Sequence, residues 1–230
     1  MSVEEDIYNG RDPRDIPTYT IPDTAHLIGV SETTLKYWVK TRPVIRKPDP
    51  RSPLLSFTNV IETYVLATLR WKHEISLRRI RPAIDYVRER FKKEHPLAEQ
   101  DFETDGTDLF VRHLDEIINA SRQGQIALPD IIEVYLKRVE WDANGRPDRY
   151  FPLVRQMAGA DPDEISDAPK IVMVDPRVSF GKPALYGSGI PTAVIASRFK
   201  AGDSIHDLSM DLDRDVAEIE EAIRYESRAA

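Results

Sequence analysis

Residues 19–38 carry the pattern of two short helices joined by a tight turn. Thr20 and Asp23 have the spacing of a capping box, so the sequence predicts that a helix begins after Thr20. Gly29 most easily adopts the left-handed conformation that ends a helix. Ser31 is a preferred N-cap and predicts that a second helix begins there. Because so little chain separates the two helices, this stretch constrains the fold to a packed helix pair.

The second predicted helix has two different faces. Its apolar face consists of side chains at steps of three and four, namely Leu35, Trp38 and Val39. The opposite face carries hydrogen-bonding and cationic groups, namely Glu32, Thr33, Lys36 and Tyr37. This is the layout of a helix-turn-helix, whose second helix enters the DNA major groove by its N-terminal turns. A plain αα-hairpin in a helical core has the same layout, and the flanking sequence has to distinguish the two.

The sequence after this helix pair fits a β-wing followed by two longer helices. Three cations lie in a Pro-rich segment over residues 46–51, and residues 54–57 are expected to pair as a strand. Apolar residues at helical spacing predict helices over residues 59–72 and 76–93. Pro82 removes a backbone donor from the second of them, so we expect a kink or a restart there.

Residues 18–93 resemble the winged helix-turn-helix of the MerR regulators. The matching residues are Tyr19-Thr-Ile, Ala25, Gly29-Val-Ser, Thr34-Leu-Lys-Tyr-Trp, Leu55-Ser-Phe and Ile75-Ser-Leu-Arg-Arg-Ile. That family usually has Arg after the position of Leu35, where this chain has Lys36, so a phosphate or base contact survives without the bidentate fork. The resemblance implies DNA contacts from the recognition helix and the wing by Ser31, Thr33, Thr34, Lys36, Tyr37, Arg46, Lys47 and Arg51.

Charge is unevenly distributed along the chain. The whole chain has 32 Lys and Arg against 39 Asp and Glu, a net charge of −7. Residues 18–94 nevertheless hold 15 basic and 8 acidic residues, a net charge of +7, whereas residues 95–230 carry −11. A basic block on an acidic protein is the electrostatic footprint of a nucleic-acid site, although a solvated charged face has the same composition.

Composition excludes several classes of protein. With no cysteine, the chain has neither disulfides nor thiolate metal ligands. No apolar run approaches the length that crosses a membrane. The acidic N-terminus, Met-Ser-Val-Glu-Glu-Asp, lacks the basic and apolar parts of a signal peptide. We therefore expect a cytoplasmic protein with a flexible tail over residues 1–17.

Nothing in the sequence predicts an enzyme, a metal site or a cofactor. Asp211, Asp213 and Asp215 alternate like the start of a calcium loop, but Val216 and Ala222 occupy the positions that require Gly and Glu. The five histidines have no ligand spacing.

Residues 96–168 predict a small α+β unit that ends in a linker. Short strands are expected over residues 108–113 and 125–128, a helix after Pro129, and a hairpin around Asn144-Gly145. The simplest role for this unit is a spacer or part of a dimer core.

The predicted helix over residues 76–93 carries an apolar seam that is a candidate dimer interface, or else intrachain core. The seam consists of Leu77, Ile80, Ile84, Val87 and Phe91.

The C-terminal segment predicts two extended pieces around a turn at Gly181, followed by three short helices. The helices are expected over residues 192–200, from Ser204, and from an N-cap at Asp213 through Tyr225. Residues 170–226 resemble the antitoxin-associated family named domain of unknown function 433. The matching residues are Asp175-Pro-Arg, Gly181-Lys-Pro, Gly187, Ile190-Pro, Ala201-Gly-Asp-Ser and Ala222-Ile-Arg-Tyr. The family usually has Arg where this chain has Gly189.

The second resemblance implies a protein partner, because members of that family commonly pair with PIN-domain ribonuclease toxins. A winged N-terminus fused to this C-terminus resembles the VapB-type antitoxins. Residues 203–226 hold nine acidic and two basic residues, a surface that a phosphate backbone repels and a basic ribonuclease attracts. Four cations of the C-terminal segment suit the carboxylates of a PIN active site, namely Arg177, Lys182, Arg198 and Lys200. The candidate toxin contacts are these cations together with Glu218, Glu220 and Glu221.

We therefore predict a mainly α fold with small β elements, of class α+β. It would comprise a winged helix-turn-helix over residues 18–95, a middle unit over residues 96–168, and a β-hairpin with three helices over residues 169–230. The predicted protein is a homodimeric antitoxin that binds a PIN-domain ribonuclease toxin and represses its own operator. Two alternatives stay open: a MerR-like regulator that senses a small molecule, and an adaptor that binds a protein but not DNA.

Overall fold

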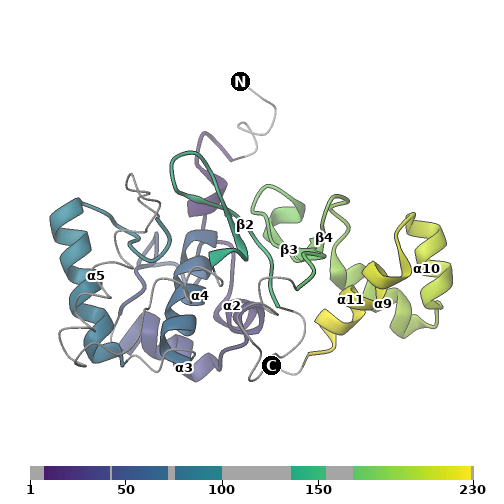
Figure 1. Ribbon diagram of the computed structural model, residues 1–230, viewed down its shortest axis with the longest axis horizontal. Helices are drawn as coiled ribbons and strands as arrows, with labels where there is room; N and C mark the ends of the chain where they lie inside the picture. Colours follow the sequence, from purple (N-terminus) through teal and green to yellow (C-terminus); the bar gives the residue numbers. More distant parts are fainter. Residues whose placement is uncertain (1–7, 42, 72–75, 100–135, 154–167, 229–230) are drawn as a thin grey trace. The chain divides into compact units, whose positions relative to one another are not determined.

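The computed structural model describes residues 8–41, 43–71, 76–99, 136–153 and 168–228 (Figure 1). The chain divides into two compact units, Met1–Asp148 and Arg149–Ala230. The described residues form helices and two small two-stranded sheets, which confirms the predicted α+β class. No helix in this part of the chain has the length and apolar character needed to span a membrane. The strands expected over residues 108–113 and 125–128 lie outside the described residues, as does the helix expected after Pro129 except for its last residue, Leu136, which is helical.

The helix pair at the start of the first unit has the predicted caps. Helix α2 (Ile21–Ile28) begins at Thr20, whose hydroxyl accepts from the Asp23 amide at 3.1 Å while the Asp23 carboxylate accepts from the Thr20 amide at 3.1 Å. Gly29 ends it with a φ of 76°. Helix α3 (Glu32–Lys36) begins at Ser31, whose hydroxyl accepts from the Thr34 amide at 3.2 Å. The chain continues directly into a π turn, η2 (Tyr37–Thr41).

The core of the first unit is built around helix α4 (Phe57–Trp71), which is buried on nearly all sides from Phe57 to Leu69. The predicted apolar face of the helix pair packs into this core, since Leu35, Trp38 and Val39 are all buried. Helix α4 begins earlier than predicted because Ser56 and Asn59 cap each other, with the Asn59 amide donating to the Ser56 hydroxyl at 3.2 Å. The predicted strand over residues 54–57 was therefore wrong and is reduced to one bridge, Tyr19 to Leu55.

Helix α5 (Leu77–Phe91) runs without interruption through Pro82. The expected restart is absent. Pro82 cannot donate to the carbonyl of Arg78, but both residues are exposed, so water can solvate that carbonyl. Ile80, Ile84 and Val87 are at most 3% exposed within the single chain. Most of the candidate dimer seam is therefore intrachain core, while the side chain of Phe91 lies outside the description.

Residues 8–17 make specific contacts, in contrast to the flexible tail predicted for residues 1–17. They include the short 3-10 turn η1 (Pro13–Asp15) and a network of ion pairs. Arg14 Nη1 lies 2.6 Å from the carboxylate of Asp142, and Arg146 binds Asp12 at 2.6 Å and Asp15 at 2.7 Å. Asp142 and Arg146 flank the turn between strands β1 (Val139–Trp141) and β2 (Pro147–Tyr150), the hairpin predicted around Asn144-Gly145.

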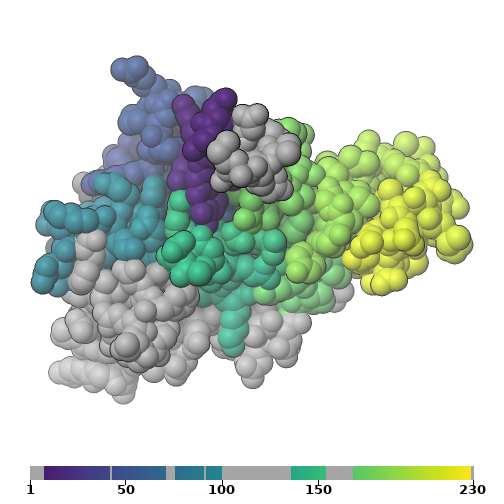
Figure 2. Space-filling view, turned by 90° about the horizontal axis from the view of Figure 1, so that it is seen from above, coloured from purple at the N-terminus to yellow at the C-terminus, as the bar shows by residue number. Residues whose placement is uncertain are grey.

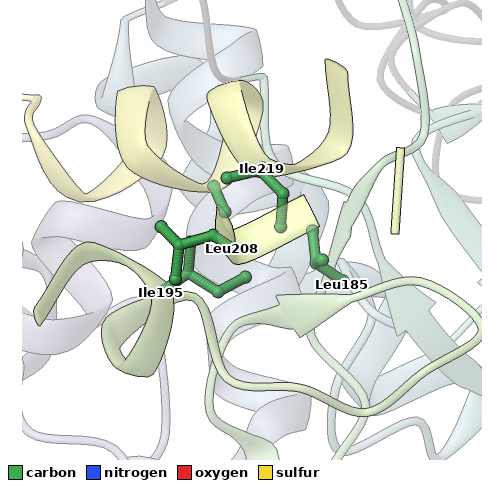
Figure 3. Close-up of a cluster of buried hydrophobic side chains, with 5 residues drawn as sticks. Leu185, Ile195, Leu208 and Ile219 are labelled. Atoms are coloured by element: carbon green, nitrogen blue, oxygen red, sulfur yellow. The ribbon is translucent and has the colours of Figure 1, made fainter. Parts of the chain in front are cut away.

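The second unit combines a small sheet with three helices. Strands β3 (Val172–Met173) and β4 (Ala184–Leu185) pair antiparallel, with Val172 opposite Leu185. The 3-10 turn η3 (Ser179–Gly181) lies between them, and helices α9 (Thr192–Ala201), α10 (Ile205–Leu212) and α11 (Val216–Glu226) follow. Leu185, Ile195, Leu208 and Ile219 come from β4 and the three helices and point toward one another in the core (Figure 3).

One predicted cap in this unit was wrong. Asp213 ends α10 in the left-handed conformation, with a φ of 50°, instead of starting the next helix. Helix α11 begins at Asp215, whose amide donates to the Glu218 carboxylate at 3.0 Å. The Asp-x-x-Glu spacing of these two residues is a capping signal of the same kind as the one at Thr20.

Candidate DNA-contacting and protein-binding surfaces

The helix α3 surface exposes most of the residues predicted to contact DNA. Ser31, Thr33, Lys36 and Tyr37 are exposed, and Thr34 is half-buried. The Ser31 hydroxyl also donates to Thr34 Oγ1 at 2.9 Å, so both hydroxyls are engaged at the helix start. Thr33, Lys36 and Tyr37 are therefore the members of the set whose side chains best suit contact with a ligand.

The ammonium of Lys36 is held by a neighbour on its own helix. Its Nζ lies 2.7 Å from the carboxylate of Glu32, one turn earlier, and both side chains are about half exposed. Exposed pairs of this kind contribute little to stability and are screened by salt. A phosphate can therefore replace Glu32 as the partner of Lys36 at small cost.

The Pro-rich segment after η2 does not form the predicted β-wing. Among residues 43–56 the structure shows bends and turns and, in place of a strand pair, only the bridge of Leu55 to Tyr19. The ammonium of Lys47 donates to the carbonyl oxygens of Pro50 and Ser52 within the same loop. Lys47 therefore fastens the loop, whereas Arg46 and Arg51 keep exposed side chains that can meet a phosphate.

A buried polar network fixes the backbone that carries Arg46. Asn59 Nδ2 donates to the Arg46 carbonyl at 2.8 Å and to Glu62 Oε2 at 2.9 Å, and both Asn59 and Glu62 are fully buried. Arg88 donates to the Val44 carbonyl at 2.8 Å and lies 3.9 Å from Glu62 Oε1. Sequence reasoning missed this network, although Asn59 and Glu62 were a visible signal, being strongly polar residues three apart on a mostly apolar helix.

His95 completes the network. Its Nδ1 lies 3.2 Å from Glu62 Oε2, an ion-pair contact without hydrogen-bond alignment. Burial lowers the pKa of His95, but the contact with Glu62 and the charges of Glu62, Glu99 and Asp15 outweigh it, and the pKa rises above its usual 6.5. Protonated His95 therefore supplies part of the positive charge that the buried Glu62 needs.

The four predicted toxin-contacting cations of the second unit have different surroundings. Arg177 grips the buried carboxylate of Asp175 with Nε at 2.9 Å and Nη2 at 3.1 Å. Arg198 binds Asp203 at 2.6 Å and Asp211 at 2.7 Å, which ties α9 to α10. Lys182 and Lys200 are exposed and have no ion-pair partner within the part of the chain that the structure describes. These two lysines are the cations most available to a partner.

The predicted acidic contacts are not a single exposed patch. Glu221 is 7% exposed and pairs with Arg224, and Glu218 caps the start of α11. Glu220 is exposed and lines an open hollow of about 300 Å³ together with Ile205, Ile223 and Arg224. Residues 205–226 are yellow-green to yellow in Figure 2. The other exposed acids among them are Asp207, Asp211, Asp213 and Asp215.

The second unit also exposes large apolar side chains that sequence reasoning did not select. Phe180 is 70% exposed and Met210 is 71% exposed. Smaller exposed fractions, from 40% to 46%, belong to Tyr186, Val194, Phe199 and Val216. In the described ranges no group of three or more acidic or histidine side chains is arranged to hold a metal ion.

Comparisons with known proteins show relatives of the C-terminal part and of nearly the whole chain. The family described as "Protein of unknown function (DUF433)" matches residues 172–225, which confirms the resemblance of this segment. A protein of Mycobacterium tuberculosis named "Putative antitoxin VapB45" is 26% identical over 216 residues, covering 82% of this chain and 84% of that protein. A second protein of the same organism, "Uncharacterized protein Rv2308", is 25% identical, and the match covers 92% of this chain and 90% of that protein.

A solved structure is similar as well. The crystal structure of Rv2018 from Mycobacterium tuberculosis superposes with a TM-score of 0.69 at 25% sequence identity. The match covers 91% of this chain and 98% of that one. The similarity therefore extends over both units.

Proposed function

We propose that this protein is the antitoxin of a type II toxin-antitoxin system. In this role it binds and neutralises a PIN-domain ribonuclease toxin, and it represses its own operon by binding operator DNA. The observation that carries the proposal is the similarity to the relative named as an antitoxin, which extends over 82% of the chain and so includes both units. The C-terminal family match over residues 172–225 supports the same reading.

Binding to operator DNA would be the task of the first unit. Helices α2 and α3 meet at Gly29, and the N-terminal turns of α3 expose Thr33, Lys36 and Tyr37. A helix presented in this way fits the major groove, and the cations Arg46 and Arg51 on the neighbouring loop suit the phosphate backbone. The MerR-like assignment of this unit stays a prediction that the binding experiments below test.

We also propose that the protein acts on DNA as a homodimer. One short recognition helix offers few base contacts, and helix-turn-helix proteins usually place two such helices on half-sites roughly 34 Å apart. Because Ile80, Ile84 and Val87 are buried within one chain, the dimer contact would have to lie elsewhere. Light scattering at micromolar concentration measures the mass, and a monomer would contradict this part of the proposal.

The decisive experiment is co-expression. The protein encoded by the neighbouring gene is produced alone, and then together with this chain, and growth and RNA cleavage are followed in both strains. We expect the neighbouring protein alone to stop growth and the pair to restore it. Toxicity that persists in the presence of this chain would contradict the antitoxin role.

A mobility-shift titration with the chain's own promoter, taken together with the co-expression result, separates the proposal from its two alternatives. An antitoxin and autorepressor should bind the promoter with a steep dependence on salt. An adaptor should leave the promoter unbound while still binding its protein partner. A regulator that senses a small molecule should bind the promoter but fail to relieve toxicity.

A further inference from the structure

The turn η3 in the second unit holds an aromatic side chain in a strained backbone conformation. Three consecutive residues have positive φ angles: Ser179 at 50°, Phe180 at 55° and Gly181 at 72°. Glycine adopts this region freely, but a bulky side chain rarely does because its Cβ meets the backbone. In the described parts of the chain, no other two adjacent non-glycine residues both have a positive φ. Such strain persists only where the surroundings enforce it.

Hydrogen bonds on both sides enforce this turn. The Ser179 hydroxyl donates to the Gly189 carbonyl at 2.8 Å, which joins the turn to the loop before α9. The Gly181 amide donates to the Val178 carbonyl at 2.9 Å, and the Val178 amide donates to the Asp175 carbonyl at 3.0 Å. The turn is thus a rigid platform for the residue at its tip.

Burial does not explain why Phe180 occupies this position. Its side chain is 70% exposed, so the aromatic ring contributes little to the core. Asn or Gly would adopt the same backbone conformation at lower cost and would expose no apolar surface. A rigid exposed aromatic ring loses little conformational entropy on binding, which is the property of the residues that anchor protein interfaces.

The charges around the turn indicate what kind of surface the ring meets. Lys182, two residues along, is exposed and has no ion-pair partner in the described part of the chain. Arg177 is held on Asp175 but leaves about a third of its side chain exposed. A pocket that takes the ring should therefore be bordered by carboxylates. A nucleic acid fits less well, because the exposed acids of α10 and α11 on the same unit repel phosphates.

We propose that Phe180 is the anchor by which the second unit docks on its toxin, entering an apolar pocket whose rim is acidic and pairs with Lys182. This inference rests on the proposed antitoxin function and assigns its partner-binding site. The predicted contacts Arg177 and Lys182 then belong to the rim of the site, with Phe180 at its centre. An aromatic anchor of this kind contributes most of the affinity, while the rim cations contribute to the rate of association.

The test measures the affinity of the full-length chain for the purified product of the neighbouring gene by calorimetry. Phe180→Asn keeps a residue that tolerates the left-handed turn and removes the ring. We expect a loss of roughly 30-fold in affinity, the fold-change of a strong anchor residue, with a melting temperature equal to or above that of the wild type. Phe180→Tyr keeps the aromatic ring and should bind within about threefold of the wild type.

Met210→Gln is the matched control, since Met210 is as exposed as Phe180 but lies on α10. We expect it to leave the affinity unchanged. Three outcomes for Phe180→Asn would overturn this inference but leave the proposed function standing: wild-type affinity for the toxin, a loss of affinity accompanied by a clearly lower melting temperature, or a loss of DNA binding or of dimer mass with toxin affinity intact. A loss of affinity in Met210→Gln equal to that in Phe180→Asn would overturn it as well. A wild-type chain that fails to bind the neighbouring protein at all would instead refute the proposed function, and the inference with it.

Discussion

Replacing Glu62 with Gln tests the buried network beneath residues 43–47. The Glu62 carboxylate is fully buried and lies 3.2 Å from His95 Nδ1 and 3.9 Å from Arg88 Nη2. Removing one member of a buried ion pair costs roughly 3–5 kcal/mol because the remaining charge stays buried. Arg88 keeps its hydrogen bond to the Val44 carbonyl, so we expect a loss near the lower end, about 3 kcal/mol. For a chain of this length that lowers the melting temperature by about 6–12 °C.

This loss should depend on pH because His95 belongs to the same network. The raised pKa of His95 stabilises the wild type below about pH 6.5, and this contribution disappears as the pH rises through the pKa of the folded state. Without the Glu62 carboxylate His95 loses the main group that raises its pKa, so its protonation should stabilise the fold less. The destabilisation caused by Glu62→Gln should therefore be larger at about pH 5.5 than at about pH 8.5.

Urea denaturation followed by tryptophan fluorescence at the two pH values measures both effects. Glu89→Gln is the control, since Glu89 is an exposed glutamate on α5, and its change should stay within about 0.5 kcal/mol. Measured in a His95→Asn background, the destabilisation caused by Glu62→Gln should be equal at the two pH values. A destabilisation below about 1 kcal/mol, or one equal at both pH values, would refute the reasoning.

Three further predictions concern other parts of the molecule. Lys36→Ala and Arg46→Ala should each weaken binding to the chain's own promoter and reduce the salt slope by about one unit, and unchanged affinity of the double variant in a mobility-shift titration would contradict this. Ile195→Ala should destabilise the second unit by about 2–5 kcal/mol in urea denaturation, because the Ile195 side chain is fully buried in the core. A change under about 1 kcal/mol would contradict this position of Ile195 in the core. Burial raises the pKa of Asp12, but hydrogen bonds and charges of Arg14 and the charge of Arg146 outweigh it and lower the pKa below 3.8. The stability difference between the wild type and Asp12→Asn should therefore be complete at neutral pH and shrink as the pH falls below 3.8, and a difference that grows in acid would contradict this sign.

Short-range signals made the helix pair predictable. The caps at Thr20 and Ser31 and the left-handed Gly29 depend on residues within a few positions of one another, and all three were read from the sequence. The same kind of signal, the Ser56–Asn59 pair, was overlooked because Leu54–Phe57 also has the composition of a strand. Asp213 and Asp215 have equal intrinsic preference for a helix start, and the reciprocal Glu218 decides between them.

The features that escaped prediction depend on distant partners or on backbone angles. Lys47 was predicted to contact phosphate, but in the folded loop its ammonium donates to the carbonyls of Pro50 and Ser52. The buried position of Glu62 depends on Arg88 and His95, which come from later in the chain. Nothing in the composition of residues 178–182 indicates that Phe180 takes a positive φ, since this conformation is imposed by hydrogen bonds across the unit.

The ion pairs between η1 and the β1–β2 turn have a consequence for how the chain folds during synthesis. Arg14 and Asp142 are 128 residues apart, and Asp12 and Arg146 are 134 apart, so these contacts close very long loops. The caps of α2 and α3 need only neighbouring residues and can form as soon as that stretch leaves the ribosome. At ordinary rates of translation the partners of Arg14 emerge several seconds after the helix pair. The nascent first unit thus passes through a stage in which the caps of α2 and α3 can form while its N-terminal ion pairs cannot.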